Sequence, residues 1–258
     1  MTQQKIHLAL DGPVATVTLD RPDKLNALDP EMLGGLESVA AQVEEDETVR
    51  VVLLTGAGDR AFCVGADINA WAALEPLDMW RRWIRDGHRV FGRLARLRQP
   101  VIAVLNGYAF GGGLELALAA DVRLALDGIE LAMPEVKIGT IPGWGGTQRL
   151  PALIGPARAK QMILTGMRID ARKAERWGLV NEVFPHEALM DEARALANAM
   201  AQNAPLSVQM AKQLIDGGGS VASLPLEALA GALAASTDDG REGIASFRER
   251  RPAQFEGR

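Results

Sequence analysis

Three consecutive glycines precede an acidic residue in a segment that could bind an anion. Gly111, Gly112 and Gly113 lie between an apolar strand pattern and a helix pattern that begins at Leu114, and Glu115 falls in the first turn. Glycine has no Cβ, so a ligand can approach the backbone closely. The N–H groups at a helix start are unpaired and carry the positive end of the helix dipole, which suits a phosphate or an oxygen that becomes negative during a reaction. The alternative is that the glycines only allow tight packing of a helix on a sheet.

A second carboxylate, Glu135, lies in an apolar, turn-rich segment that runs from Met133 to Leu150. Burial in such surroundings would raise its pKa and let it act as an acid near neutral pH. A solvent-exposed loop glutamate is the alternative that this segment alone favours.

One glycine pattern is similar to a dinucleotide-binding motif. Gly56-x-Gly58-x-x-Ala61 follows an apolar strand pattern, as such motifs do. A dinucleotide motif leads directly into a helix, whereas the segment from Ala61 to Val64 is typical of an extended chain and meets another glycine. The sequence therefore disfavours a nucleotide cofactor here.

Strands and helices alternate along the first two thirds of the chain. Alternation around Asp11-Gly12 predicts a hairpin with strands near 5–10 and 14–19, and Asp29-Pro30 predicts the start of a helix. Apolar strands at 51–54, 101–105 and 129–133 and helix patterns at 32–43 and 114–126 predict an α/β fold with mostly parallel strands. Helical stretches then follow one another, at 156–165, 170–177, 186–201, 205–216 and 225–235, with a weaker strand signal at 179–184. We therefore expect a core over 1–195 and a helical C-terminal region over 196–258.

Three long motifs together resemble the crotonase family (enoyl-CoA hydratase/isomerase). They span residues 61–68, 106–117 and 134–150, and shorter matches occur at 21–28 and 242–252. The resemblance covers essentially the whole chain, in the family's order. It implies a crotonase-like ββα superhelix with a C-terminal helical trimerisation region.

The resemblance also implies an activity and the residues that perform it. In this family two backbone N–H groups hold the thioester oxygen of an acyl-CoA, and the matching positions are Ala66 and Gly112. Glu115 would deprotonate the attacking water, Glu135 would deliver a proton to carbon 2 on the same face, and Gly143 would help to hold the water. The implied reaction is reversible syn addition of water to a 2-enoyl-CoA, which gives a 3-hydroxyacyl-CoA.

Both glutamates are present, which favours a hydratase, because isomerases of the family can work with the carboxylate at the Glu135 position alone. A 3,2-enoyl-CoA isomerase and another acyl-CoA reaction, such as methylglutaconyl-CoA hydration, are the alternatives. Coenzyme A is part of the substrate, and the resemblance implies no separate cofactor and no metal. Positions that match the family's CoA-binding segments are Lys24, Val64, Ala66 and Phe247, while Asn69 stands where relatives often have lysine.

Four tryptophans lie in segments that shape the acyl pocket in relatives. They are Trp71, Trp80, Trp83 and Trp144, the last of which replaces an expected small residue. We expect a short or shaped pocket and an activity that falls as the acyl chain lengthens. Ordinary aromatic packing or a subunit contact is the alternative.

An arginine-rich helix pattern over 78–98 offers a function of a different class. Its arginines step by three or four residues along one face, at Arg82, Arg85, Arg89, Arg93 and Arg96. Such a stripe could bind RNA, although a solvated or ion-paired face is the more common structure.

Composition excludes several classes of protein. The 258 residues carry 33 acidic and 28 basic side chains, 48% are hydrophobic, and no run is long and apolar enough to cross a membrane. The net acidity argues against generic polyanion binding. The single Cys63 has no partner for an internal disulfide, the N-terminus has no signal-peptide pattern, and the three histidines lack metal-ligand spacing. We expect a cytoplasmic homotrimer or dimer of trimers with no membrane or nucleic-acid partner.

Overall fold

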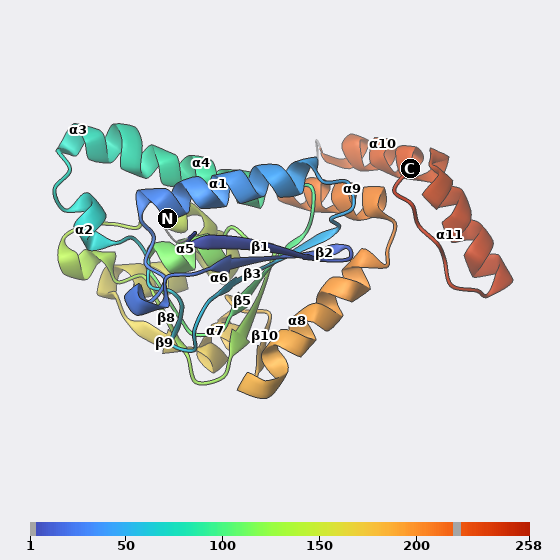
Figure 1. The fold of residues 1–258 in the computed structure, drawn as a ribbon. Helices are drawn as coiled ribbons and strands as arrows, with labels where there is room; N and C mark the ends of the chain where they lie inside the picture. Colours follow the sequence, from blue (N-terminus) through green and yellow to red (C-terminus); the bar gives the residue numbers. More distant parts are fainter. Residues whose placement is uncertain (1–3, 219–222) are drawn as a thin grey trace.

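The larger of two β-sheets forms the centre of the molecule in a computed structural model that describes residues 4–218 and 223–258 (Figure 1). Its strand order is β1-β2-β3-β5-β7-β10, and only the β1–β2 hairpin is antiparallel. The strands are β1 (Ile6–Asp11), β2 (Val14–Leu19), β3 (Val51–Gly56), β5 (Val101–Leu105), β7 (Val122–Leu126) and β10 (Glu182–Phe184). The predicted hairpin and the strands near 51–54 and 101–105 are thus confirmed.

The smaller sheet has the order β4-β6-β8-β9 and is made of three-residue strands. They are β4 (Ala61–Cys63), β6 (Tyr108–Phe110), β8 (Glu130–Ala132) and β9 (Arg168–Asp170). Successive strands alternate between the sheets, because β3 leads to β4, β5 to β6 and β7 to β8, and helices follow each pair. This repeat confirms the expected ββα superhelix. The loop after Gly56 leads into β4 and not into a helix, which is unlike a dinucleotide-binding turn.

Helix α1 (Pro30–Glu45) starts where the sequence predicts, because the Asp29 carboxylate accepts the N–H of Met32 at 2.9 Å. Its predicted apolar face is buried. It packs beside α4 (Arg85–Ala95), which is preceded by the short helices α2 (Ile68–Trp71) and α3 (Pro76–Asp78) and a π-helical turn at Met79–Ile84. This α2–α4 segment forms one wall of the cavity described below.

The other face of the large sheet is covered by α8 (His186–Ala201), whose alanines and Leu189 pack on β3, β5 and β7. Residue 195, the expected end of the core, lies inside this helix. The remaining helices are α5 (Gly112–Ala117), α6 (Gly146–Thr165), α7 (Ala171–Trp177), α9 (Pro205–Asp216), α10 (Ser223–Ser236) and α11 (Asp238–Glu249), with 3-10 turns at Pro22–Lys24 and Glu135–Ile138.

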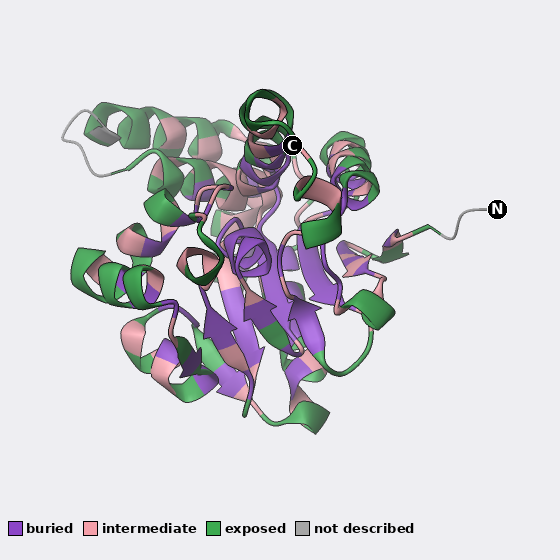
Figure 2. Cartoon of the chain, turned by 90° about the vertical axis from the view of Figure 1, so that its left-hand side faces the viewer, coloured by how far each residue is buried: buried purple, intermediate pink, exposed green. Residues whose placement is uncertain are grey.

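Helices α10 and α11 project from the body of the molecule (Figure 1). Burial is concentrated on the strands, whereas the outer helices are mostly exposed (Figure 2). Helix α10 exposes four large apolar side chains, Leu224, Leu226, Leu229 and Leu233. Within the described ranges, no helix combines the length and the apolar character that a membrane span requires.

The helix predicted over 114–126 is wrong in its second half. Helix α5 ends at Ala117, and the residues from Val122 onward form the central strand β7. The buried Arg123 guanidinium donates hydrogen bonds to the carbonyl oxygens of Ala117 and Ala120, at 3.4 and 2.7 Å, and so satisfies the helix end. A continuous apolar run is compatible with either structure, and here tertiary pairing decides.

Two of the five arginines in the predicted stripe are held in ion pairs with α1. Arg89 contacts Glu37 at 2.8 Å, and Arg93 contacts Glu37 at 2.9 Å and Glu44 at 2.6 Å. These contacts tie α4 to α1. RNA binding by the stripe stays an untested alternative.

Candidate active site

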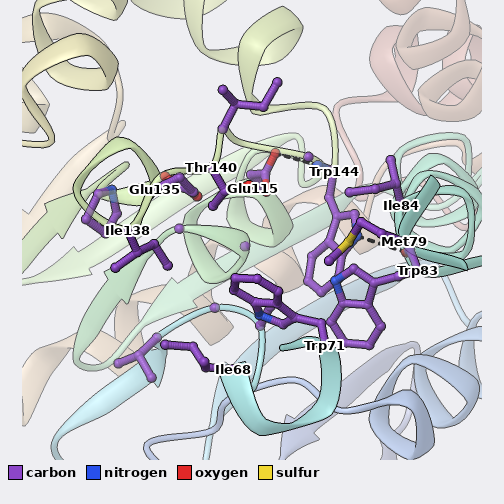
Figure 3. Close-up of a pocket in the computed structure, with 18 of the residues that line it drawn as sticks. Ile68, Trp71, Met79, Trp83, Ile84, Glu115, Glu135, Ile138, Thr140 and Trp144 are labelled. Atoms are coloured by element: carbon purple, nitrogen blue, oxygen red, sulfur yellow. Dashed lines mark hydrogen bonds between the residues drawn. The ribbon is translucent and has the colours of Figure 1, made fainter. Parts of the chain in front are cut away.

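A cavity of about 280 Å³ lies between the small sheet, the start of α5 and the α2–α4 segment. Figure 3 shows the carboxyl groups of Glu115 and Glu135 at one side of it and the indole rings of Trp71 and Trp83 at another. The remaining lining is largely apolar, with Ile68, Met79, Ile84, Ile138, Ile141 and Trp144. Besides the two glutamates, the polar side chains of the lining are Thr140 and Lys137.

The loops after β4 and β6 bring the backbone of Ala66 and Gly112 together. A Cβ on Gly112 would lie 3.4 Å from the Ala66 nitrogen, and one on Gly65 would lie 3.0 Å from the Gly112 nitrogen. Gly65 and Gly111 have φ values of +101° and +52°, a region that favours glycine. Neither the Ala66 nor the Gly112 N–H donates a hydrogen bond to another described residue, and both residues line the cavity. Two such donors can stabilise an oxygen that becomes negative.

Glu115 is held in the first turn of α5 and is only 2% exposed. Its Oε1 accepts the backbone N–H groups of Trp144 and Gly146, both at 2.7 Å. Burial raises the pKa of this carboxyl, while those two N–H groups, that of Gly143 and the positive charge of Arg149 act to lower it. The pKa is raised overall because burial outweighs these donors, and since a carboxylate with a raised pKa is a stronger base, ionised Glu115 is suited to accept a proton.

Glu135 has a different environment. It begins the 3-10 turn after β8, and its Oε2 is buried with no hydrogen-bond partner among the described residues. Burial and, to a smaller extent, the nearby charge of Glu115 together raise its pKa to about 7, although its own backbone N–H acts to lower it. With this pKa, and with no donor to Oε2 in the described part of the chain, the carboxyl keeps its proton up to about neutral pH, so Glu135 is suited to deliver a proton.

The structure gathers most of the predicted site residues around this cavity. Val64 and Gly143 line it, together with Trp71, Trp83 and Trp144. Lys24 is exposed and lies outside the lining, but the segment that follows it pairs with the β4–α2 loop. The N–H of Val64 donates to the Leu25 oxygen at 3.2 Å.

Besides Lys24, the predicted residues Trp80 and Phe247 lie away from the cavity in this chain. Trp80 is 63% exposed, because it is on the outer side of the π-helical turn whose Met79, Trp83 and Ile84 line the cavity. Trp80 therefore does not line the cavity that this chain forms, and its expected role in shaping the acyl pocket finds no support in this geometry. Phe247 is 84% exposed on the projecting helix α11, so it lies outside the cavity that one chain forms.

Sequence reasoning did not identify the backbone donor Gly146, which holds Glu115, or Arg149, which lies close to it. Gly146 supplies one N–H, and a Cβ there would lie 2.9 Å from Glu115 Oε1. Arg149 supplies positive charge and donates to the Trp144 oxygen at 3.1 Å. The sequence signal that could have revealed these donors is the pair of glycines, Gly145 and Gly146, at the start of α6.

Cys63 is buried, and burial raises the pKa of its thiol to about 12. Its sulfur accepts the Gly65 N–H at 3.4 Å, which is consistent with a packing role.

A repeated ββα fold with two free N–H groups beside two carboxylates defines a crotonase-type enzyme. Residues 10–258 match the family model described as enoyl-CoA hydratase/isomerase. The chain belongs to the enoyl-CoA hydratase/isomerase family.

Similar proteins cover almost the whole chain. A short-chain-enoyl-CoA hydratase of Clostridium acetobutylicum is 40% identical over 97% of both chains. An (E)-benzylidenesuccinyl-CoA hydratase of Thauera aromatica is also 40% identical, over 98% of this chain and 99% of the relative. The crystal structure of an enoyl-CoA hydratase from Bacillus anthracis has a TM-score of 0.95 and 37% identity, and the match covers 99% of this chain and all of that one (100%).

Proposed function

We propose that this protein catalyses the reversible syn addition of water to the 2,3 double bond of a 2-enoyl-CoA. The observation that carries the proposal is the unequal pair of carboxylates beside two free N–H groups. Glu115 has donors that stabilise its negative charge, whereas Glu135 Oε2 has no hydrogen-bond partner among the described residues. One group is therefore suited to be the base and the other the acid, in a single cavity.

In the proposed reaction the thioester oxygen binds the N–H groups of Ala66 and Gly112. Ionised Glu115 takes a proton from water as the water oxygen bonds to carbon 3, and the double-bond electrons move toward the thioester oxygen. Protonated Glu135 supplies the proton to carbon 2, so the pair still holds one proton, now on Glu115, and proton exchange must return it to Glu135 before the next turnover. Stabilisation of the enolate oxygen is a large effect, since loss of one such donor typically costs about 3–4 kcal/mol.

The proposal is tested with crotonyl-CoA, whose conjugated thioester absorbs in the ultraviolet. We expect purified protein to remove this absorbance and to form 3-hydroxybutyryl-CoA, identified by mass. In a parallel reaction, 3-butenoyl-CoA reports on isomerisation through the appearance of crotonyl-CoA. A folded protein that converts 3-butenoyl-CoA and leaves crotonyl-CoA unhydrated would contradict the hydratase proposal and favour the isomerase alternative.

The similarity to relatives leaves the acyl group open, because the two equally similar relatives carry different acyl groups in their names. Both names are those of hydratases, which supports the reaction type.

We also propose a cytoplasmic homotrimer or dimer of trimers. The exposed leucines of α10 and the exposed Phe247 of α11 support an assembly role for the projecting helices.

We expect kcat/KM for crotonyl-CoA to have a bell-shaped pH dependence. On the basic side it falls as pH rises through about 7, because Glu135 loses the proton it must deliver. On the acidic side it falls as Glu115 becomes protonated, at a pH above the ordinary glutamate range because burial raises this pKa. The apparent values belong to the coupled pair. Initial rates in both directions across the pH range are the measurement, and a flat profile between about pH 6 and 9 would contradict it.

A further inference from the structure

The indole of Trp144 is fixed at the border of the cavity. It is only 2% exposed, and its ring centroid lies 5.2 Å from that of Trp83 and 5.3 Å from that of Phe91. Its Nε1–H donates to the Trp83 carbonyl oxygen at 3.2 Å. Figure 3 shows the ring descending from the loop that binds Glu115 toward Trp83. These contacts hold the Trp144 ring in one position, so this part of the cavity wall is rigid.

Gly87 provides the space for this ring. It lies inside α4, and a Cβ there would be 2.1 Å from both Cδ1 and Nε1 of Trp144. Glycine is less favourable than alanine in a helix interior, and φ of Gly87 is not in the positive region, so the backbone does not require it. The packing of Trp144 accounts for a glycine at this position.

The opposite edge of the ring reaches the oxyanion segment. A Cβ on Gly112 would lie 2.7 Å from Cζ3 of Trp144. An acyl chain whose thioester oxygen binds at Gly112 therefore begins beside this ring. Its reacting carbons must lie near Glu115 and Glu135, and its tail then extends along the part of the cavity wall that Trp71, Trp83 and Met79 form.

We propose that Trp144, seated against Gly87, is a specificity-determining residue that restricts the pocket to short acyl chains. This inference rests on the proposed function. It assigns the limit on acyl-chain length to two residues that pack against each other, Trp144 and Gly87. Removal of the ring opens a space between α4 and the oxyanion segment into which a longer tail can extend.

The test measures equilibrium binding of saturated acyl-CoAs, which cannot be hydrated, by calorimetry on the full-length protein. The variants are Trp144→Ala and the control Trp80→Ala, which removes a tryptophan that is exposed and outside the cavity. We expect wild type to bind butyryl-CoA more tightly than decanoyl-CoA. Trp144→Ala is expected to shift this ratio toward decanoyl-CoA by at least about tenfold, within the usual range for a hydrophobic pocket, while Trp80→Ala leaves it unchanged.

Thermal unfolding of Gly87→Ala in two backgrounds tests the interlock without any ligand. Beside Trp144 the new methyl group overlaps the ring, so we expect a lower Tm. In the Trp144→Ala background the same change meets no ring and improves helix propensity, so we expect an equal or higher Tm. A Gly87→Ala effect that is the same in both backgrounds would overturn the interlock.

The outcomes separate this inference from the proposed function. An unchanged butyryl-to-decanoyl ratio in a folded Trp144→Ala protein that still binds acyl-CoA overturns the specificity role alone. Failure of wild type to bind any acyl-CoA overturns both proposals. If Trp144→Ala does not fold, Trp144→Leu carries the same ratio test, because leucine fills less of the slot than indole.

Discussion

Glu135→Gln is expected to lower kcat for crotonyl-CoA hydration by about 10²–10⁴-fold, the usual contribution of a positioned general acid. Glutamine has nearly the same shape but has no carboxylic proton to deliver to carbon 2. The wild-type carboxyl holds that proton because burial and the charge of Glu115 raise its pKa to about 7. Rates at saturating and limiting substrate, with butyryl-CoA binding measured separately, distinguish lost chemistry from lost binding.

Glu115→Gln is the matched variant for this experiment. It removes the base, and we expect a loss of similar size, while the double variant loses little more than either single one. Residues that act as a unit in one step are strongly non-additive in this way. A Glu135→Gln protein that retains more than about half of the wild-type kcat would remove Glu135 from the mechanism.

Gly113→Ala is expected to cost both stability and activity. A Cβ at this buried position would lie 2.0 Å from the Cys63 carbonyl oxygen, and that atom belongs to backbone that cannot simply rotate away. Relief of the overlap must separate the end of β4 from the start of α5, the two segments that carry Ala66 and Gly112. Overpacking of this kind costs about 1–3 kcal/mol of unfolding free energy.

Loss of the alignment of the two donors should lower kcat/KM by about 10²-fold or more. Denaturant unfolding and crotonyl-CoA kinetics on the same preparation measure the two effects.

Gly34→Ala is the matched control for this substitution. Gly34 lies exposed inside α1, where a Cβ meets nothing within 4 Å. We expect it to be neutral or to stabilise the fold by about 0.4–1 kcal/mol, because alanine restricts the unfolded chain. If Gly113→Ala behaves like Gly34→Ala in stability and in rate, close backbone contact does not set the geometry of the two N–H groups.

Elements with strong local signals could be predicted from the sequence. The hairpin around Asp11-Gly12 and helix α1 after Asp29 follow from turn and capping chemistry, which involves neighbours within a few residues. Helices α8 and α9 have the predicted bounds, 186–201 and 205–216. Three-residue strands such as β6 and β9 carry too little periodicity to be found, and their existence depends on pairing with distant segments.

The chemical groups of the candidate site are also encoded in the sequence. The glycine triplet, Glu115 and Glu135 lie in motifs long enough to indicate the family, and the structure places them around one cavity. Their catalytic roles stay a prediction until the variants are measured. The same motifs could not show that Trp83 lines this cavity while Trp80 faces solvent, because that difference arises from a π-helical turn.

The sequence by itself determined which residues are available and, through local turns and caps, where many elements begin and end. Only the tertiary structure decided that α5 stops at Ala117, that Gly87 admits Trp144, and that the two glutamates differ. Glu115 is held by Trp144, 29 residues further along the chain, whereas Glu135 Oε2 is buried and meets no donor from residues 4–218 or 223–258. Proton affinity depends on the dielectric and the donors around each carboxyl, and these surroundings come from segments that meet only when the chain folds.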